Sequence, residues 1–350
     1  MKRLGLPQYS AVDWLNRIEC SPYAKASLDS YSEGELVLEL EKKIAKLLNK
    51  PAALFFSKGM TAQFCMLKVA ESRAQQQRFI MSPYSHLAVD EENSFEHLLG
   101  LEAILPTHEP RPYVAADLND SVTAAAMLVE LPLRRAGFKL PTWDNLLELQ
   151  DWANERSIHF HMDGARLWES RHFYNRSEAD IASLFDTVYV SLYKGLGGLG
   201  GALLTGEKDF IEECKVWRSR FAGNHYTLFP FLITALDGLA ENYAKMEELV
   251  ERAKEIAKAL SGIAGLHITE IQTNGFVVLL DKSLDTSTEE LNTRIELLSK
   301  QLGIHVTNGV TTMPYSEQRI IEIQVGANHQ DIRTNEIVSY FERLLASSIR

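Results

Sequence analysis

The segment from Ser157 to Gly206 constrains the fold more than any other part of this chain. It reads SIHFHMDGARLWES, then a spacer, then TVYVSLYKGLGGLGGALLTG. Its apolar runs predict three short strands, at residues 158–162, 187–192 and 201–205. Asp163 ends the first strand, and Lys194 follows the second within a glycine-rich turn. An acid and an amine at the ends of neighbouring strands indicate a ligand site at the carboxyl edge of an α/β sheet.

Strands and helices also alternate upstream of this segment. The patterns predict strands at residues 52–56, 78–82 and 124–131, the last of which ends at Glu130. They predict helices at residues 35–49, from the turn after Ser57 to about 74, around Asp90–Glu92 and at 143–156. Such alternation predicts an α/β fold with a mostly parallel sheet and helices on both of its faces.

The pattern changes after Gly206. Two long helical stretches, at 208–220 and 227–260, precede short strands that alternate with helices. These strands are predicted at 267–271, 275–280, 305–307 and 319–325, and the helices at 286–302 and 332–346. We therefore expect three parts, which are an irregular N-terminal arm (1–34), a large domain (35–245) and a smaller α+β C-terminal domain (246–350).

Charge and composition exclude several classes of protein. The formal net charge is −11, so no basic surface is expected for nucleic acid or anionic lipid. No stretch is apolar enough for a membrane span or a signal peptide, and we expect a cytoplasmic protein. Cys20, Cys65 and Cys214 are odd in number and lack metal-ligand spacing, so we expect buried thiols and no metal site.

The lysine and the acid favour one kind of cofactor chemistry. A lysine at a strand end can form a Schiff base with an aldehyde cofactor, and pyridoxal 5'-phosphate (PLP) pairs such a lysine with an acid at its ring nitrogen. Lys194 lies 31 residues after Asp163, about one strand–loop–strand unit. Taken singly, Lys194 could be a surface lysine and Asp163 a helix N-cap. Together, next to five glycines that allow a close backbone approach, they favour a PLP site.

Two further features lie upstream at the same predicted sheet edge. The strand-to-helix turn of Ser57–Gln63 exposes backbone N–H groups at a helix N-terminus, which suits a phosphate. His86 follows the predicted strand at 78–82. Either feature alone would be weak, because many α/β turns and surface histidines look alike.

The chain also resembles a known family. HMDGARLWES and SLYKGLGGLGG look like the threonine aldolase and β-eliminating lyase group of PLP enzymes, which have the aspartate-aminotransferase-like fold (fold type I). Further segments match the family in the same order, over roughly residues 20–330: LDSYSEGELVLELEKKIAKLLNKPAALFFSKGMTAQ, YSHLAVDEENS, VELPLRRAGFKLP and RIIEIQVG.

The resemblance implies a role for each matching residue near the cofactor ring. Lys194 is implied to hold PLP as a Schiff base, and Asp163 to pair with the pyridine nitrogen. His86 is implied to stack on one face of the ring and to act in proton transfer, and Ala165 to pack against the other face.

The remaining implied contacts lie at the cofactor phosphate and the substrate carboxylate. The phosphate is expected to contact four residues of one turn: Ser57, Gly59, Met60 and Thr61. Arg166 and Arg319 are implied to bind the substrate carboxylate, and Arg166 could instead reach the cofactor. A planar guanidinium suits bidentate carboxylate binding.

Three features depart from the family pattern. Lys58 and Met60 flank Gly59, where the family commonly has a hydroxyl residue, and Tyr193 precedes the lysine, where a small hydroxyl residue is common. The loop ELPLRRAGF also differs. These departures indicate a divergent branch whose substrate need not be threonine.

We therefore predict a PLP-dependent lyase that cleaves a β-hydroxy-α-amino acid, such as threonine or allo-threonine, to glycine and an aldehyde. β-Elimination, racemisation or transamination with the same cofactor stays open, as does a PLP-binding protein without catalysis. The resemblance also implies a homodimer or homotetramer, in which one subunit contributes residues to the site of the other.

Overall fold

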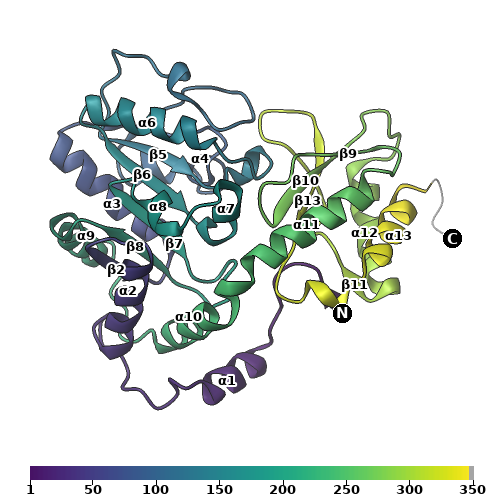
Figure 1. The fold of residues 1–350 in the computed structure, drawn as a ribbon, viewed down its shortest axis with the longest axis horizontal. Helices are drawn as coiled ribbons and strands as arrows, with labels where there is room; N and C mark the ends of the chain where they lie inside the picture. Colours follow the sequence, from purple (N-terminus) through teal and green to yellow (C-terminus); the bar gives the residue numbers. More distant parts are fainter. Residues whose placement is uncertain (347–350) are drawn as a thin grey trace. The chain divides into compact units, whose positions relative to one another are not determined.

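The computed structural model describes residues 1–346 and forms two compact units (Figure 1). The larger unit comprises Tyr9–Arg134 and Lys139–Tyr243. The smaller unit comprises Met1–Gln8, Arg135–Phe138 and Ala244–Arg350, of which residues 347–350 lie outside the described part. The chain thus passes from one unit to the other at Tyr243, close to the predicted domain limit after residue 245, and the first eight residues belong to the smaller unit.

The larger unit is built on a seven-stranded sheet with the strand order β2-β8-β7-β6-β5-β3-β4. Its strands are β2 (Ala52–Phe56), β3 (Arg78–Ile80), β4 (Glu102–Ile104), β5 (Ala126–Glu130), β6 (His159–Gly164), β7 (Thr187–Ser191) and β8 (Ala202–Gly206). All neighbours from β4 to β7 are parallel, and β8 is antiparallel to both β7 and β2. The predicted α/β fold with a mostly parallel sheet is confirmed. The three-residue β4 was not predicted, because it is too short to show a pattern.

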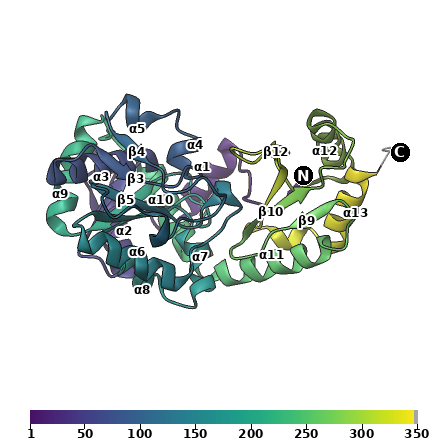
Figure 2. The same ribbon diagram turned by 90° about the horizontal axis from the view of Figure 1, so that it is seen from above.

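Helices cover both faces of this sheet (Figures 1 and 2). The helices of the larger unit are α1 (Ala11–Cys20), which lies away from the sheet (Figure 1), α2 (Glu35–Leu47), α3 (Gly59–Ala74), α4 (His86–Val89), α5 (Ser94–His97), α6 (Trp143–Glu155), α7 (Leu167–Tyr174), α8 (Glu178–Ala182), α9 (Lys208–Arg220) and α10 (Phe229–Asn242). On β6, the buried His161 contacts Gln63 of α3 at 2.8 Å, whereas the adjacent Phe160 stacks on Phe185 after α8. Since successive strand residues point to opposite faces, α3 and the α8 segment lie on different sides.

Three local predictions are wrong. Asp90–Glu92 are not helical, because α4 ends at Val89 and the chain turns through a left-handed Glu92 (φ 50°). The N-terminal segment is not irregular throughout, since it contains α1, whose first turn is closed by a reciprocal capping box between Ser10 and Asp13. The long helix predicted at 227–260 is interrupted by a 3₁₀ turn at Tyr243–Lys245, where the chain leaves the larger unit.

The smaller unit contains an antiparallel sheet with the order β12-β13-β10-β9. Its strands are β9 (Leu266–Ile268), β10 (Gly275–Leu280), β12 (Val310–Thr312) and β13 (Arg319–Gln324). A separate parallel pair joins β1 (Lys2–Arg3) to β11 (Ile304–His305). The helices are α11 (Met246–Leu260), α12 (Thr288–Leu302) and α13 (Thr334–Leu345). This α+β arrangement agrees with the predicted pattern.

Two of the three thiols are buried in the core of the larger unit. Cys65 and Cys214 are fully buried in the cluster between α3 and α9, as predicted, whereas Cys20 at the end of α1 is exposed. The prediction for Cys20 was wrong because α1 buries none of its residues. Among residues 1–346, no helix is both long enough and apolar enough to cross a membrane.

Candidate active site

Three side chains form a row across the carboxyl ends of neighbouring strands. Glu130 on β5 is opposite Asp163 on β6, which is in turn opposite Tyr189 on β7. In-register residues of parallel strands point to the same face of a sheet, so these three side chains face the same side. Asp163 and Tyr189 are buried, with 9% and 4% of their surface exposed. Asp163 therefore lies at the strand end where the sequence predicted it, flanked by a second acid and a phenol.

Lys194 lies three residues beyond β7, in the glycine-rich turn. Gly195 is required next to it, because a Cβ there would lie 2.5 Å from the carboxylate of buried Glu169. Burial, and then the positive charge of Arg166, lowers the pKa of the Lys194 amine to about 8, while Asp163 and Glu130 oppose this shift. At a given pH below about 8, a much larger fraction of the Lys194 amine is therefore neutral and nucleophilic than of an exposed lysine.

The two neighbouring acids both resist ionisation. Burial, and then the charge of Asp163, raises the pKa of Glu130 to about 7. Burial also raises the pKa of Asp163, although the charges of Lys194, His86 and Arg166 act in the opposite direction. A ligand with a positively charged N–H group would stabilise the ionised form of Asp163 and so oppose the effect of burial. The site of Asp163 is therefore suited to such a ligand.

His86 begins α4 and is held at this edge by Glu130. The backbone N–H of His86 donates to Glu130 Oε2 at 2.7 Å. Its ring nitrogens face two carboxylates, with Nδ1 2.9 Å from Asp90 Oδ2 and Nε2 2.9 Å from Glu91 Oε1. The structure thus brings His86 close enough for its charge to act on Asp163. Its predicted stacking on a cofactor ring stays a prediction.

The predicted phosphate turn lies at the start of α3. Gly59 is the first helical residue, and its N-cap residue Lys58 makes no side-chain cap. Ser57 Oγ is 3.0 Å from His225 Nε2, and Met60 is buried in the core. The first backbone N–H groups of a helix have no partner within the helix, so Gly59, Met60 and Thr61 offer an anion site there.

Ala165 and Arg166 follow β6 directly. The Ala165 N–H donates to Asp163 Oδ1 at 3.2 Å, which fixes the orientation of that carboxyl group. Arg166 is the N-cap residue of α7, and its charge acts on Asp163, Glu169, Tyr193 and Lys194. Both residues therefore lie at the same strand end as Asp163.

Arg319 belongs to the smaller unit, at the start of β13. Its guanidinium donates to the backbone oxygens of Leu284, at 2.9 Å, and Thr286. These bonds hold the side chain against the loop that precedes α12. The predicted role of Arg319 in carboxylate binding stays a prediction.

Sequence reasoning missed several polar residues at this edge. Glu130 was placed at a strand end without a role, and Glu169, Tyr189 and His225 were not considered. Glu169 carries a fully buried carboxylate, neither oxygen of which has a hydrogen-bond partner in residues 1–346, and burial raises its pKa. A signal was present for Tyr189, whose phenol lies between two valines in a predicted strand, whereas Glu169 lies in a mixed polar segment.

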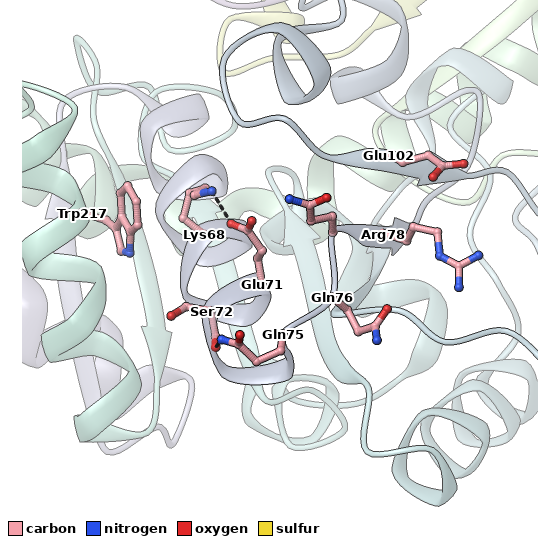
Figure 3. Close-up of a pocket in the computed structure, with 9 residues that line it drawn as sticks. Lys68, Glu71, Ser72, Gln75, Gln76, Arg78, Glu102 and Trp217 are labelled. Atoms are coloured by element: carbon pink, nitrogen blue, oxygen red, sulfur yellow. Dashed lines mark hydrogen bonds and ion pairs between the residues drawn. The ribbon is translucent and has the colours of Figure 1, made fainter.

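A separate cavity of about 670 Å³ lies elsewhere on the larger unit (Figure 3). It is lined by the C-terminal half of α3, the first residue of β3 and Trp217 of α9. Two of its charges are already satisfied, because Lys68 pairs with Glu71 and lies 5.4 Å from the Trp217 ring centre. The cavity is at the amino end of β3, and ligands of open α/β sheets bind at the carboxyl ends of the strands. The candidate active site is therefore the edge with Asp163 and Lys194.

The residues at this edge fit PLP. An aldehyde needs an amine of low pKa, which Lys194 provides, and a pyridinium nitrogen needs a buried acid, which Asp163 provides. A phosphate needs N–H donors, and the uncapped start of α3 provides them. The glycines after Lys194 let this turn pack closely against the rest of the larger unit, since a Cβ at Gly195 would meet Glu169 and one at Gly198 would meet Leu192 O.

Comparisons with known proteins agree with this chemistry. The model of the β-eliminating lyase family matches residues 23–283. A structure from Listeria monocytogenes, provisionally described as an L-allo-threonine aldolase, superimposes with a TM-score of 0.89 at 29% identity, covering 98% of this chain and 95% of the other. The low-specificity L-threonine aldolase of Escherichia coli is 25% identical over 321 residues, which are 87% of this chain and 92% of the relative. A threonine aldolase structure from Leishmania major, at 16% identity and TM-score 0.75, covers 99% of this chain and all (100%) of its own, and supports the fold alone.

The fold and the site define a fold type I PLP-dependent lyase. The chain belongs to the β-eliminating lyase family. Enzymes of this class act on small amino-acid substrates, and the resemblance stated from HMDGARLWES and SLYKGLGGLGG is confirmed.

The lowered pKa of Lys194 predicts how cofactor uptake depends on pH. Only the neutral amine attacks an aldehyde, so the rate of PLP incorporation into the apoprotein should rise through about pH 8 instead of about pH 10.5. The Arg166→Gln variant removes a positive charge that lowers this pKa, so its midpoint should move to higher pH. The measurement is the rate of growth of the visible absorbance band at each pH.

Arg171→Gln is the matched control, because Arg171 lies on the same helix and pairs with Glu178, away from Lys194. Its midpoint should equal that of the wild type. A wild-type midpoint near pH 10.5 would show that the Lys194 amine behaves as in water, contrary to the geometry described above.

Proposed function

We propose that this protein cleaves a β-hydroxy-α-amino acid between Cα and Cβ to give glycine and an aldehyde. The observation that carries the proposal is the joint placement of Lys194 and Asp163, whose charges interact at one strand edge of a β-eliminating lyase fold. Relatives that are named threonine aldolases support the choice of substrate class.

Each residue has a distinct part in this proposal. Lys194 would hold the cofactor through its ε-nitrogen, and Asp163 would pair with the pyridine N–H. PLP, when bound, withdraws electrons from the substrate Cα and so makes the Cα–Cβ bond easier to break. The N–H groups of Gly59, Met60 and Thr61, with Ser57 nearby, would bind the phosphate. Ala165 would pack against the ring.

The substrate would be oriented and deprotonated by the remaining residues. Arg166, and Arg319 in the complete enzyme, would bind the α-carboxylate, since a guanidinium binds a carboxylate at two points. His86 is our candidate for the base that accepts the β-hydroxyl proton, because imidazole exchanges protons near neutral pH. Its contacts with Asp90 and Glu91 would orient the ring.

We also propose that the protein assembles as a homodimer or homotetramer and acts in the cytoplasm. The exposed side chains of Val12 and Leu15 on α1, a helix that buries none of its residues, support a surface covered by a second copy. Light scattering coupled to size-exclusion chromatography tests this, and a monomer at micromolar concentration would contradict it.

A substrate panel on the PLP-loaded protein tests the reaction. Release of glycine and an aldehyde from L-threonine, L-allo-threonine or phenylserine is expected, with one of the three preferred. If none yields an aldehyde, the proposed bond cleavage is wrong, and release of pyruvate and ammonia from serine would instead indicate β-elimination.

A further inference from the structure

Tyr189 has an unusual position on the sheet. It lies on β7 within the run TVYVS and is 4% exposed. A Cβ added to Gly59 would lie 2.0 Å from the Tyr189 hydroxyl oxygen and 2.6 Å from its Cζ. The hydroxyl is therefore in close contact with Gly59, the first residue of α3. Any side chain at position 59 would collide with the Tyr189 ring.

The Tyr189 hydroxyl has no protein partner. Within residues 1–346 it makes no hydrogen bond to another residue. Two other buried phenols behave differently, since the Tyr113 hydroxyl donates to Leu128 O at 2.7 Å and the Tyr174 hydroxyl to Pro141 O at 2.9 Å. The Tyr189 oxygen is not one of the buried side-chain atoms that lack a partner in residues 1–346, so it is open at the strand edge. A hydroxyl group that the protein leaves unpaired at such a place is available to a ligand that accepts its hydrogen bond.

The backbone N–H groups at the start of α3 also lack hydrogen-bond acceptors within the helix. No side chain caps this helix, and its first turn contains no acidic residue. The unpaired N–H groups and the helix dipole attract an anion. The turn also lacks a hydroxyl residue directly beside Gly59, which is flanked by Lys58 and Met60. The Tyr189 hydroxyl lies next to this glycine from another strand.

We propose that the Tyr189 hydroxyl donates a hydrogen bond to the phosphate group of the cofactor, in place of a hydroxyl residue in the turn. The inference rests on the proposed PLP binding and adds a residue to it. Burial raises the pKa of Tyr189 well above its ordinary value, so the group stays a neutral O–H donor at physiological pH. Its position opposite Asp163 on the neighbouring strand places the phenol at the same strand edge as the ring site.

Tyr189→Phe tests the proposal, with affinity measured for two ligands that differ by one phosphate. Apoprotein is titrated with PLP and, separately, with pyridoxal, and binding is followed by absorbance. A hydrogen bond to a charged group corresponds to roughly a 10- to 100-fold change in Kd. We expect PLP to bind about that much more weakly to the variant, and pyridoxal to bind as it does to the wild type. Equal weakening for both ligands, or no change for PLP, would overturn the proposal.

Tyr113→Phe is the matched control, because it removes a buried hydroxyl that already has a backbone partner. It should leave the ratio of the PLP and pyridoxal affinities unchanged. A change in that ratio as large as in Tyr189→Phe would show that the effect is not specific to the phosphate.

A second measurement does not depend on the cofactor ring. Inorganic phosphate added to the apoprotein should raise the Tm of the wild type, and should raise that of Tyr189→Phe clearly less. An equal rise in both proteins would contradict a phosphate contact from Tyr189. If the wild type binds neither PLP nor pyridoxal, the proposed function fails, whereas normal wild-type binding with an unaffected variant rejects the Tyr189 assignment alone.

Discussion

Lys194→Ala is expected to lower kcat/KM by at least about 10³-fold and to remove the visible absorbance of the bound cofactor. Under the proposed function this amine would anchor the cofactor and transfer protons at the reacting carbon, and positioned proton transfer alone contributes roughly 10²- to 10⁴-fold. Aldehyde release and the absorbance spectrum after dialysis measure the two effects separately.

Lys50→Ala is the matched control for this variant. Lys50 is also a lysine whose pKa is lowered, first of all by burial, and its amine donates to Phe185 O at 2.5 Å. It lies before β2, at the opposite end of that strand from the turn at Ser57. It should keep the spectrum and most of the activity. A fully active Lys194→Ala protein would show that the reaction does not use this amine.

Asp163→Asn is expected to lower kcat/KM by about 10²- to 10³-fold, the usual effect of removing one preorganised electrostatic partner. The amide keeps the hydrogen bond from Ala165 N–H but carries no negative charge to hold a pyridinium nitrogen. Steady-state kinetics on the variant reconstituted with PLP measure the loss.

The stability of the Asp163→Asn apoprotein is expected to match or exceed that of the wild type at pH 7. The folded-state pKa of Asp163 is raised, so the folded protein binds this proton more tightly than the unfolded chain does. Its contribution to stability is then fully present below the unfolded-state pKa and is lost as the pH rises through the folded-state pKa. The Asp163→Asn variant has no titratable group at this position, so its stability does not fall in this way as the pH rises. A large fall in Tm would mean that the carboxylate is structurally required and is not reserved for a ligand.

Asp186→Asn provides the control for both measurements. Asp186 lies just before β7 and accepts a hydrogen bond from Phe160 N at 2.7 Å, at the opposite end of β7 from the site. The amide oxygen can keep this bond, so activity should be nearly unchanged. Loss of activity in this variant equal to that of Asp163→Asn would show that any acid at either sheet edge matters.

The sequence was sufficient to predict the sheet edge and the placement of Asp163 and Lys194 at it. The runs that became β6 and β7 are apolar and end in polar or glycine-rich turns, and such local patterns mark buried parallel strands. Asp163 and Lys194 could therefore be placed from short-range features alone. The cofactor followed from the chemistry of the pair and from the family resemblance.

The parts that could not be predicted depend on long-range contacts or on caps. Tyr189 touches Gly59, which is far upstream, and no local pattern records that contact. The loop at Asp90–Glu92 looked helical by composition, but a left-handed Glu92 ends the turn. Helix α1 was missed because it has no buried face, although its capping box, Ser10 to Asp13, was present in the sequence.

The most direct test of the account is to load the protein with PLP, reduce it with borohydride and locate the modified residue by peptide mass spectrometry. Reduction makes the bond between the lysine nitrogen and the cofactor permanent, so the readout needs no substrate and no assumption about the reaction. A phosphopyridoxyl group is expected on Lys194. Modification of a different lysine, or none although PLP is bound, would contradict it.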